Sequence, residues 1–465
     1  MFNVPKRICC LGVSIGLMCV SSVALGQLCA PQWSALGSGA TGGSGNPGVY
    51  SMALFDDGTG PALYVLGRFL QVGGTPTNGF AKWQGSRWTS FPGYGGSESF
   101  IQMASFDDGS GPGLWYPFAK WTGTTEVPIP HPPYTSLGTG SRYPVVVFND
   151  GNGPAIYFGG AFSGNGYNGI ARWNGTSWST VGGGVIRTGG QAANVTSFGV
   201  FDDDGPGPHA AALYAGGAFD FAGGVPAKGI AKWDGTSWSA VGGGVAGVTV
   251  GGFEFTPQPY SMAAYNDGSG PALYVSGYIR FAGGQPVEYL VRWNGSTWST
   301  NFGATFDGDQ AYAMQVFDDG SGPALFLAGS SLSNVGVLRY GIAKWNGISW
   351  TYPSTNPDTF YQGLALAAYD SGSGPGLYVG GRFTTIGGIT ANRIARYGRP
   401  LCPANCDGSF NTAGCPTRSA NDFICFMNRF AAGDLRANCD NTTTTPTLTA
   451  NDFQCFLNAY AAGCS

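Results

Sequence analysis

One phrase recurs seven times along the chain, and this repetition constrains the fold more than any other feature. Each copy runs from an aromatic residue through acids or asparagine and glycine to a Gly-Pro pair. The copies begin at Phe55, Phe106, Phe148, Phe201, Tyr265, Phe317 and Tyr369. Their spacing averages about 52 residues, a period typical of repeat architectures in which each unit is one supersecondary motif.

A second phrase follows each copy of the first and consists of a hydrophobic, a small, a basic and an aromatic residue, usually before a glycine turn. It occupies residues 80–85, 118–123, 170–175, 230–235, 290–295, 342–347 and 394–398. In five units a second tryptophan follows: Trp83/Trp88, Trp173/Trp178, Trp233/Trp238, Trp293/Trp298 and Trp345/Trp350. Each unit therefore predicts four strands, which in the first unit are SMALF, ALYVLG, GFAKW and RWTSF. This pattern is typical of a β-propeller blade.

The two ends of the repeat region complement each other. The seventh unit stops at residues 397–400 without a fourth strand, and residues 32–37 (QWSALG) match the missing piece. We therefore predict an all-β fold, a seven-bladed β-propeller over residues 27–400 that the N-terminal strand closes, because closure removes exposed strand edges. An open solenoid is the alternative. A second alternative is a ring of six complete blades plus a defective one, because the second unit runs into a proline-rich segment.

The recurring charged residues predict a structural ion-pair ladder, because a charge inside a sheet needs a partner. The basic members are Lys82, Lys120, Arg172, Lys232, Arg292, Lys344 and Arg396. The acidic phrase supplies Asp56, Asp107, Asn149, Asp202, Asn266, Asp318 and Asp370, followed by Asp57, Asp108, Asp150, Asp203, Asp267 and Asp319. A ligand-binding ring is the alternative for the ladder, and calcium is the alternative for the acidic loops, where an aspartate more often bonds its own loop backbone. The tryptophan pairs predict packing between neighbouring blades, with sugar stacking as the alternative.

The N-terminus and the cysteines predict export. Residues 1–26 resemble a signal peptide, with Lys6 and Arg7 before an apolar run and a small-residue cleavage site. No later stretch is long enough to span a membrane. Eight cysteines follow, and their number and clustering predict disulfides: Cys29, Cys402, Cys406, Cys415, Cys425, Cys439, Cys455 and Cys464. If the ring closes, Cys29 and Cys402 extend from neighbouring strands and are candidates for one bond.

Composition argues against several function classes. Charged residues make up only 10% of the chain and the net charge is −4, which does not suit nucleic acid binding. There are two histidines and four glutamates, and no acid pair, metal-binding spacing or nucleophile motif stands out from the repeat. We predict no catalytic residues and no cofactor in the repeat region, and the balance favours a protein that is not an enzyme.

The composition changes at Cys402, and two half-repeats follow (404–434 and 437–464). They carry Asn405-Cys406-Asp407-Gly408-Ser409 with Asn421-Asp422-Phe423-Ile424-Cys425-Phe426, and Asn438-Cys439-Asp440 with Asn451-Asp452-Phe453-Gln454-Cys455-Phe456 before Gly463-Cys464. This segment, 401–465, resembles the cysteine-containing, Gly-Cys-ending type of dockerin in exported proteins of planctomycete-like bacteria. More loosely, the repeat region resembles bacterial kelch-like propellers, as in Gly380-Gly381-Arg382-Phe383 with Ile394-Ala395-Arg396.

The dockerin resemblance implies a small helical module with two EF-hand-like calcium loops and a cohesin-like partner. The implied calcium ligands are Asn405, Asp407, Ser409 and Asp422 in one loop, and Asn438, Asp440, Thr442 and Asp452 in the other. Both loops depart from the pattern, because asparagine opens each and threonines 442–445 replace an acid and a glycine. We expect weak calcium binding, with disulfides in the structural role of the metal.

Two functions are consistent with the sequence. The first is a secreted, non-catalytic propeller for extracellular binding or structure, held at the cell surface or in an assembly by its dockerin-like module. The second is an extracellular carbohydrate-active enzyme, a hydrolase or lyase, that carries a dockerin. The expected partners are a cohesin-like or cell-surface protein and a polysaccharide, without nucleic acid or a membrane span.

Overall fold

The computed structural model describes residues 30–43, 45–91, 100–116, 118–137, 142–189, 193–205, 207, 210–250, 253–300, 310–330, 332, 341–354, 360–371, 374–399, 420–431 and 449–462. This part of the chain is almost entirely β-structure, with two helices near the C-terminal end, α2 (Ala420–Ala431) and α3 (Ala450–Ala462). The predicted signal peptide and Cys29 lie outside the described residues.

In the described part of the chain, the repeats form seven four-stranded antiparallel sheets, each of which has its strands in the spatial order first to fourth. They are sheet 1, β3 (Gly48–Asp56), β4 (Pro61–Arg68), β7 (Phe80–Trp83) and β8 (Trp88–Ser90); sheet 2, β10 (Ala104–Asp107), β11 (Pro112–Tyr116), β12 (Ala119–Trp121) and β13 (Glu126–Pro128); sheet 3, β16 (Val145–Asn149), β17 (Pro154–Gly159), β19 (Ile170–Trp173) and β20 (Trp178–Thr180); sheet 4, β22 (Asn194–Phe201), β23 (Ala212–Ala218), β26 (Ile230–Trp233) and β27 (Trp238–Ala240). The others are sheet 5, β31 (Gln258–Asn266), β32 (Pro271–Tyr278), β35 (Leu290–Trp293) and β36 (Trp298–Ser299); sheet 6, β37 (Ala311–Asp318), β38 (Pro323–Gly329), β39 (Ile342–Trp345) and β40 (Trp350–Thr351); and sheet 7, β41 (Phe360–Asp370), β42 (Pro375–Phe383), β45 (Ile394–Gly398) and β1 (Gln32–Ala35).

Short strands lie in the segments before the first strands and between the second and third strands. The three-stranded sets are β2 (Ala40–Thr41), β5 (Gln71–Val72) and β6 (Thr75–Pro76); β21 (Val185–Ile186), β24 (Phe221–Ala222) and β25 (Val225–Pro226); and β28 (Val245–Ala246), β33 (Phe281–Ala282) and β34 (Gln285–Pro286). The pairs are β9 (Phe100–Ile101) with β15 (Arg142–Tyr143), β14 (Ser136–Leu137) with β18 (Phe162–Ser163), β29 (Thr249–Val250) with β30 (Phe253–Glu254), and β43 (Thr385–Ile386) with β44 (Ile389–Thr390).

The predicted four strands per unit are confirmed, including those of the irregular second unit. In sheet 2 only a short turn separates β11 from β12, and Phe118 in that turn has a φ of 65°. Glu126–Pro128 forms the fourth strand and pairs with β12, although it carries no tryptophan. The second unit is therefore irregular but four-stranded.

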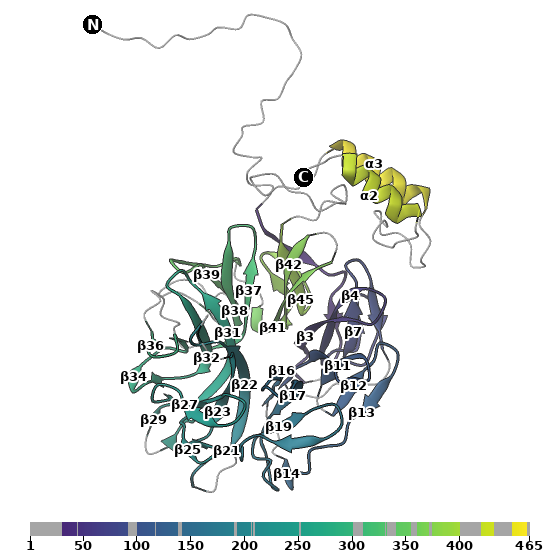
Figure 1. Ribbon diagram of the computed structural model, residues 1–465. Helices are drawn as coiled ribbons and strands as arrows, with labels where there is room; N and C mark the ends of the chain where they lie inside the picture. Colours follow the sequence, from purple (N-terminus) through teal and green to yellow (C-terminus); the bar gives the residue numbers. More distant parts are fainter. Residues whose placement is uncertain are drawn as a thin grey trace, which may run out of the picture.

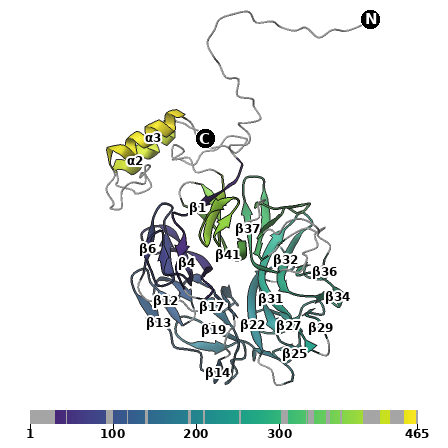
Figure 2. The same cartoon turned by 180° about the vertical axis from the view of Figure 1, so that it is seen from behind.

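The predicted pairing between the two ends of the repeat region is also confirmed. Strand β1 pairs antiparallel with β45, and Trp33 lies opposite Tyr397. In Figure 2, β1 lies beside the light-green strands of sheet 7. The first strands of successive sheets contact one another from sheet 1 to sheet 7, and β3 of sheet 1 contacts β41 and β42 of sheet 7. The seven sheets therefore follow one another around a common centre, and the first and last are neighbours (Figure 1).

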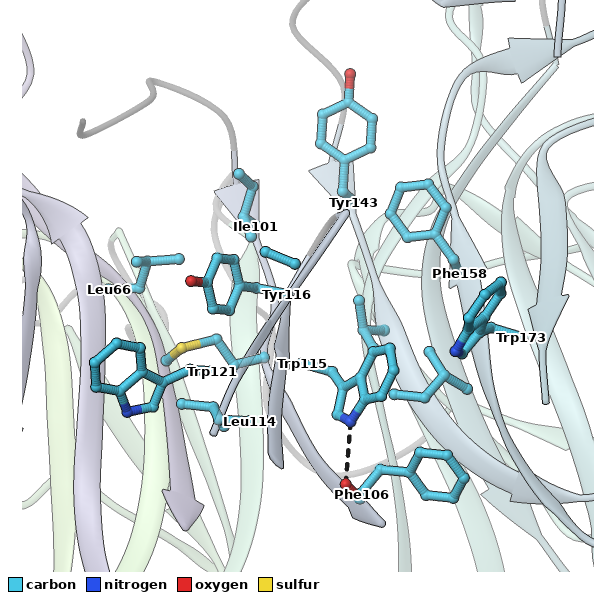
Figure 3. Packing of buried hydrophobic residues seen from close by; sticks show 14 of the residues in the cluster. Leu66, Ile101, Phe106, Leu114, Trp115, Tyr116, Trp121, Tyr143, Phe158 and Trp173 are labelled. Atoms are coloured by element: carbon cyan, nitrogen blue, oxygen red, sulfur yellow. Dashed lines mark hydrogen bonds between the residues drawn. The ribbon is translucent and has the colours of Figure 1, made fainter. Parts of the chain in front are cut away.

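The hydrophobic core lies between neighbouring sheets rather than at one central point. Second strands are almost wholly buried; in β4, for example, Ala62 to Val65 are completely inaccessible. The cluster in Figure 3 joins sheets 1, 2 and 3, with Leu66, Trp115 and Phe158 among its members. Burying one such side chain contributes about 1.5–3 kcal/mol, so each interface between sheets stabilises the fold.

The two helices pack through aromatic rings. Phe426 of α2 stacks on Phe456 of α3 with ring centroids 3.9 Å apart, and both side chains are buried. Thr449 precedes α3, where its hydroxyl accepts from the amide of Asn451 and its own amide donates to the carboxylate of Asp452. This reciprocal arrangement is a capping box, which satisfies amides that a helix start leaves without partners. None of the described helices is long and apolar enough to cross a membrane.

Candidate functional site

The predicted ion-pair ladder forms in six of the seven sheets. The pairs are Lys82–Asp57 at 2.7 Å, Lys120–Asp108 at 2.6 Å, Arg172–Asp150 at 2.9 Å, Lys232–Asp203 at 2.6 Å, Arg292–Asp267 at 3.5 Å and Lys344–Asp319 at 2.6 Å. The second acid of each loop pairs with the cation. Burial raises the pKa of Asp57, but hydrogen bonds from Lys82, Thr59 and Tyr64 outweigh that effect and lower the pKa to about 2. The carboxylates of this ladder hold their sheets together from inside.

The first acid of each loop has a local role. The carboxylate of Asp56 accepts hydrogen bonds from the amides of Gly58 and Gly60, and Asp107 does the same with Gly109 and Gly111. The prediction that such an aspartate bonds its own loop backbone is therefore confirmed. We call residues 56–60 and their equivalents in the other sheets the acidic loops.

The predicted role of the tryptophans in packing between sheets is confirmed. The two rings of each pair lie 4.9–5.2 Å apart. The second tryptophan also donates a hydrogen bond to a backbone carbonyl of the preceding sheet's connection, as Trp238 does to Val181 and Trp298 does to Gly242. Trp33 of β1 follows the same rule in sheet 7, because its ring contacts Tyr397 and its Nε1 donates to Pro353.

Each regular junction between sheets is covered at the acidic-loop end by the hairpin turn between the third and fourth strands. At Gly235 of sheet 4, φ is +101° and a Cβ would lie 2.4 Å from the carbonyl oxygen of Asp150 in sheet 3. The equivalent glycines 85, 123, 175, 295 and 347 approach the preceding acidic loop equally closely, at 2.1–2.9 Å. Only glycine combines a positive φ with so close an approach.

The junction between sheets 6 and 7 departs from this pattern. The fourth strand of sheet 7 is β1, which comes from the other end of the chain, so no hairpin links it to β45. Arg399 lies on the acidic loop of sheet 6 instead and donates to the carbonyl of Gly320 at 3.0 Å. A cavity of about 490 Å³ opens here between sheets 6, 7 and 1, lined by Leu54, Phe317, Asp318, Asp319, Gly320, Ala368, Tyr369, Asp370, Gly374, Pro375, Arg396 and Arg399. We call it the seam cavity.

The prediction of a seventh ion pair is wrong, because Ser371 takes the place of the second acid in sheet 7. Arg396 is only 4% exposed. The ion pairs found among the described residues include none with Arg396. Its guanidinium donates to the carbonyls of Gly374, Pro375 and Arg399 at 3.1–3.2 Å. Burial lowers the pKa of Arg396, which the nearby Tyr378 and Asp370 partly oppose.

A second distinctive group of residues lies at the opposite end of the ring, where the first strands begin. Strands β3, β31 and β37 each contain a β-bulge, at Tyr50, Tyr260 and Tyr312 respectively. A bulge adds one unpaired residue and redirects its side chain, and bulges are frequent beside functional sites.

These tyrosines join with two arginines and a glutamine. The Arg142 guanidinium lies 4.4 Å from the Tyr260 ring centre and 5.5 Å from that of Tyr312, so it reaches from the segment before sheet 3 to sheets 5 and 6. Gln362 of sheet 7 donates to the Tyr312 hydroxyl at 3.4 Å and accepts from Arg382 at 3.0 Å. We call Tyr50, Arg142, Tyr260, Tyr312, Gln362 and Arg382 the axial cluster.

Burial and neighbouring groups have opposite effects on the pKa values of Arg142 and Tyr260 in the axial cluster. Burial lowers the pKa of Arg142 to about 10, and Tyr260 and Tyr312 oppose that shift. Burial also raises the pKa of Tyr260, while the Arg142 charge opposes the rise. Both groups therefore keep their usual protonation at neutral pH, and the cluster presents cationic and neutral hydrogen-bond donors beside aromatic faces.

Sequence reasoning missed the axial cluster, although a signal was present. Tyr50 and Tyr260 each open a Tyr-Ser-Met sequence at the start of a first strand, and Tyr312 precedes Ala-Met at the same place. This recurrence marks a shared position. The bulge that turns the side chain depends on strand register, which the repeat pattern does not show.

Of the predicted calcium ligands, the structure describes Asp422 and Asp452, and both are fully buried. Asp452 serves in the capping box of α3, where its carboxylate accepts a hydrogen bond from the amide of Thr449. Asn405, Asp407, Ser409, Asn438, Asp440 and Thr442 lie outside the described residues. Cys425 and Cys455 each take part in a disulfide. The remaining cysteines, 29, 402, 406, 415, 439 and 464, also lie outside.

Comparisons with known proteins identify no family for this chain. No protein-family model matches it, and no curated protein matches it. The solved structures that resemble it include the extracellular domain of a hybrid two component system from B. thetaiotaomicron, with 10% identity, a TM-score of 0.46 and coverage of 79% of this chain and 39% of that one. A related structure, described as the extracellular domain of a one component system from B. thetaiotaomicron, has 9% identity, a TM-score of 0.45 and coverage of 79% and 40%.

An arginine-to-alanine mutant of AofleA from Arthrobotrys oligospora has 14% identity and a TM-score of 0.33, with coverage of 70% of this chain and 90% of that one. The chain spans about two fifths of the length of the first two neighbours. Likenesses of this size carry no argument about what this chain does.

Proposed function

We propose that the ring of seven sheets is a seven-bladed β-propeller belonging to a secreted, non-catalytic binding protein, and that the axial cluster binds its ligand. The observation that carries the proposal is the presence of three bulge tyrosines, from sheets 1, 5 and 6, around Arg142 and Arg382. Propellers leave a central channel, and side chains at its mouth converge from several blades. A ligand there contacts residues that no single repeat could bring together.

The chemistry of the axial cluster suits a polysaccharide. Tyrosine rings offer flat apolar faces for the C–H surface of a sugar, while arginine, glutamine and tyrosine side chains offer hydrogen bonds to hydroxyl groups. The alternative, glycoside hydrolysis, requires two opposed carboxyl groups. The six residues of the axial cluster include none, which favours binding over turnover.

The sequence of the C-terminal module supports attachment through a dockerin-like mode to a cohesin-like or cell-surface protein. The described part supplies two helices that pack through Phe426 and Phe456. On α2, Phe423, Ile424 and Met427 are exposed. An exposed apolar group on a helix suits a partner surface, and weak calcium binding by the module remains part of this proposal. The signal-like N-terminus and the cysteine pattern support export.

The test is binding of the full mature chain to an array of polysaccharides, followed by calorimetry on the ligand found. We expect binding to fall at least tenfold in Tyr312→Ala and Arg142→Met, because each removes a cluster member. Tyr352→Ala is the matched control, since Tyr352 lies in the segment after the outer strand of sheet 6 and is also half-buried. A flat array, or equal losses in the control, would contradict the proposal.

The enzyme alternative has its own readout. The polysaccharide that binds is incubated with the protein across a wide pH range, and new reducing ends or unsaturated products are measured. We expect none. Turnover that disappears in a variant of a single Asp or Glu would replace binding by catalysis as the function.

A further inference from the structure

The seam cavity lies at the acidic-loop end of the ring, opposite the axial cluster, and its origin is the way the ring closes. At the other junctions a glycine hairpin covers the preceding acidic loop, whereas sheet 7 receives its outer strand from the N-terminal segment. The uncovered space measures about 490 Å³, within the range of small-molecule sites.

Arg396 is the charged group in this cavity that differs from its counterparts. In the other six sheets the equivalent cation pairs with the second carboxylate of its own acidic loop, as Lys344 does with Asp319 at 2.6 Å. Ser371 replaces that carboxylate in sheet 7. The two terminal nitrogens of the Arg396 guanidinium donate to backbone carbonyls, so neutral groups take the place of the aspartate. A buried cation of this kind favours an anionic partner.

Gly376 gives the arginine its position. Five other sheets carry alanine here, at residues 62, 155, 212, 272 and 324. A Cβ at residue 376 would lie 2.3 Å from the Nε of Arg396, so the side chain occupies space that the alanine methyl fills elsewhere. Ser371 therefore removes the carboxylate, and Gly376 gives the Arg396 side chain space to lie against the second strand.

We propose that the seam cavity binds a small organic carboxylate whose carboxyl group pairs with Arg396, in the role that an aspartate has in the other six sheets. The apolar lining, which includes Leu54, Phe317 and Tyr369, contacts the hydrocarbon or aromatic body of the ligand. Leu54 is 39% exposed, so its side chain is accessible to a ligand. The inference is independent of the polysaccharide proposal, because the two sites lie at opposite ends of the ring.

Other charges line the cavity and limit which anions fit. The charge of Asp319 is neutralised by its ion pair with Lys344. The exposed carboxylates of Asp318 and Asp370 accept hydrogen bonds from backbone amides of their own loops. Arg399 adds a second cation at the rim. Two solvated acids at the rim disfavour polyanions, so a monocarboxylate with an apolar body fits better than a phosphate or a polyacid.

The test uses the full mature chain with benzoate, phenylacetate and hexanoate as probes and 2-phenylethanol as the uncharged control. Thermal unfolding is followed at rising probe concentration, since a ligand of the folded state raises the midpoint by mass action. We expect at least one carboxylate to raise the midpoint of the natural protein, and 2-phenylethanol to have no comparable effect.

Ser371→Asp is the decisive variant because it restores the acid present in the other six sheets. We expect it to weaken carboxylate binding about tenfold or more, since the aspartate then competes for Arg396. Ser371→Ala is the matched control and should bind as the natural protein does. Leu54→Trp, which narrows the cavity without touching the ion pairs, should also weaken binding and serves as the second variant if Ser371→Asp fails to fold.

Two results would overturn the proposal. One is the lack of a shift with all three carboxylates. The other is a shift that is equal in the natural protein, Ser371→Asp and Leu54→Trp, which would place the binding elsewhere. Variants of the axial cluster that lose polysaccharide binding should still bind the carboxylate probes. The two proposals can therefore be contradicted independently of each other.

Discussion

The junction between sheets 3 and 4 and the junction between sheets 6 and 7 are built from the same repeat, yet they differ in three respects. At the first, Gly235 rests on the Asp150 loop, Asp150 pairs with Arg172, and a cavity of about 240 Å³ lies beside the outer strand of sheet 3. At the second, Arg399 takes the place of the hairpin, Ser371 leaves Arg396 without its aspartate, and a cavity of about 490 Å³ lies beside the first strands.

The difference between these junctions arises from the way a repeat protein closes its ring. A strand from the far end of the chain satisfies the edge of sheet 7, because Trp33 and its neighbours reproduce the contacts of an ordinary fourth strand. It does not bring the turn that normally precedes that strand. The missing turn makes this junction unlike the others, and the seam cavity lies where that turn is absent.

The largest expected effect comes from removing the closing strand. Deletion of residues 30–36 leaves sheet 7 with a bare edge and removes the contacts of Trp33 and Leu36, so we expect a loss of more than about 3 kcal/mol, comparable to a deleted core aromatic. Thermal unfolding by circular dichroism measures it. Gln32→Ala, at an exposed position, is the control. An unchanged midpoint in the deletion would show that closure adds no stability.

Acid should destabilise the sheets that contain an ion pair. Hydrogen bonds and ion pairs keep the pKa of Asp57 near 2, and the pKa values of Asp108, Asp150 and Asp267 are also lowered despite burial, which acts in the opposite direction. An unfolded aspartate has a pKa of about 3.9. The stability that these groups contribute is therefore complete above a pH of about 4 and is lost as the pH falls toward 2.

Denaturant midpoints measured from pH 6 to pH 2 check this expectation. The natural protein should lose stability steeply below pH 4, and Asp150→Asn should show a shallower loss because one titrating group is gone. A flat profile over this range, or identical slopes for the two proteins, would contradict the proposed linkage.

Breaking one ion pair should cost less than removing the closing strand but more than a surface change. Asp150→Ala leaves Arg172 buried without its carboxylate, and we expect a loss of about 3 kcal/mol. Ser371→Ala is the matched change at the seam, where no ion pair exists among the described residues, and should cost under about 1 kcal/mol. Urea unfolding at pH 7 measures both. Equal losses would remove the distinction between the junctions.

The smallest expected effect concerns the glycine turn. Gly235→Ala forces a Cβ to 2.4 Å from the Asp150 carbonyl in addition to the strain of a positive φ, whereas Gly153→Ala has a similar φ of +93° and open space around it. We expect a loss of about 2 kcal/mol in the first and about 1 kcal/mol in the second. The difference between the two midpoints isolates the contact between sheets, and no difference would mean that the loop moves aside freely.

Most of the fold could be predicted from the repeated phrase. Its period and its alternation of strands and turns predicted the four-stranded units, and the match between residues 32–37 and the third and fourth units predicted the pairing of Trp33 with the last sheet. Charge pattern predicted the ladder as well. It did not reveal which of two adjacent acids faces the cation, because Asp56 and Asp57 differ only in the side of the backbone from which each projects.

Local sequence determined the elements of this protein, because turn glycines, strand residues and paired charges act over a few positions and recur with the unit. The positions of the axial cluster and the seam cavity could be determined only from the tertiary structure. Bulges bring Tyr50, Tyr260 and Tyr312 together from sheets far apart in the chain, and the missing hairpin at the seam leaves Arg396 beside a cavity. Both depend on register and ring closure, which are long-range properties that no single repeat encodes.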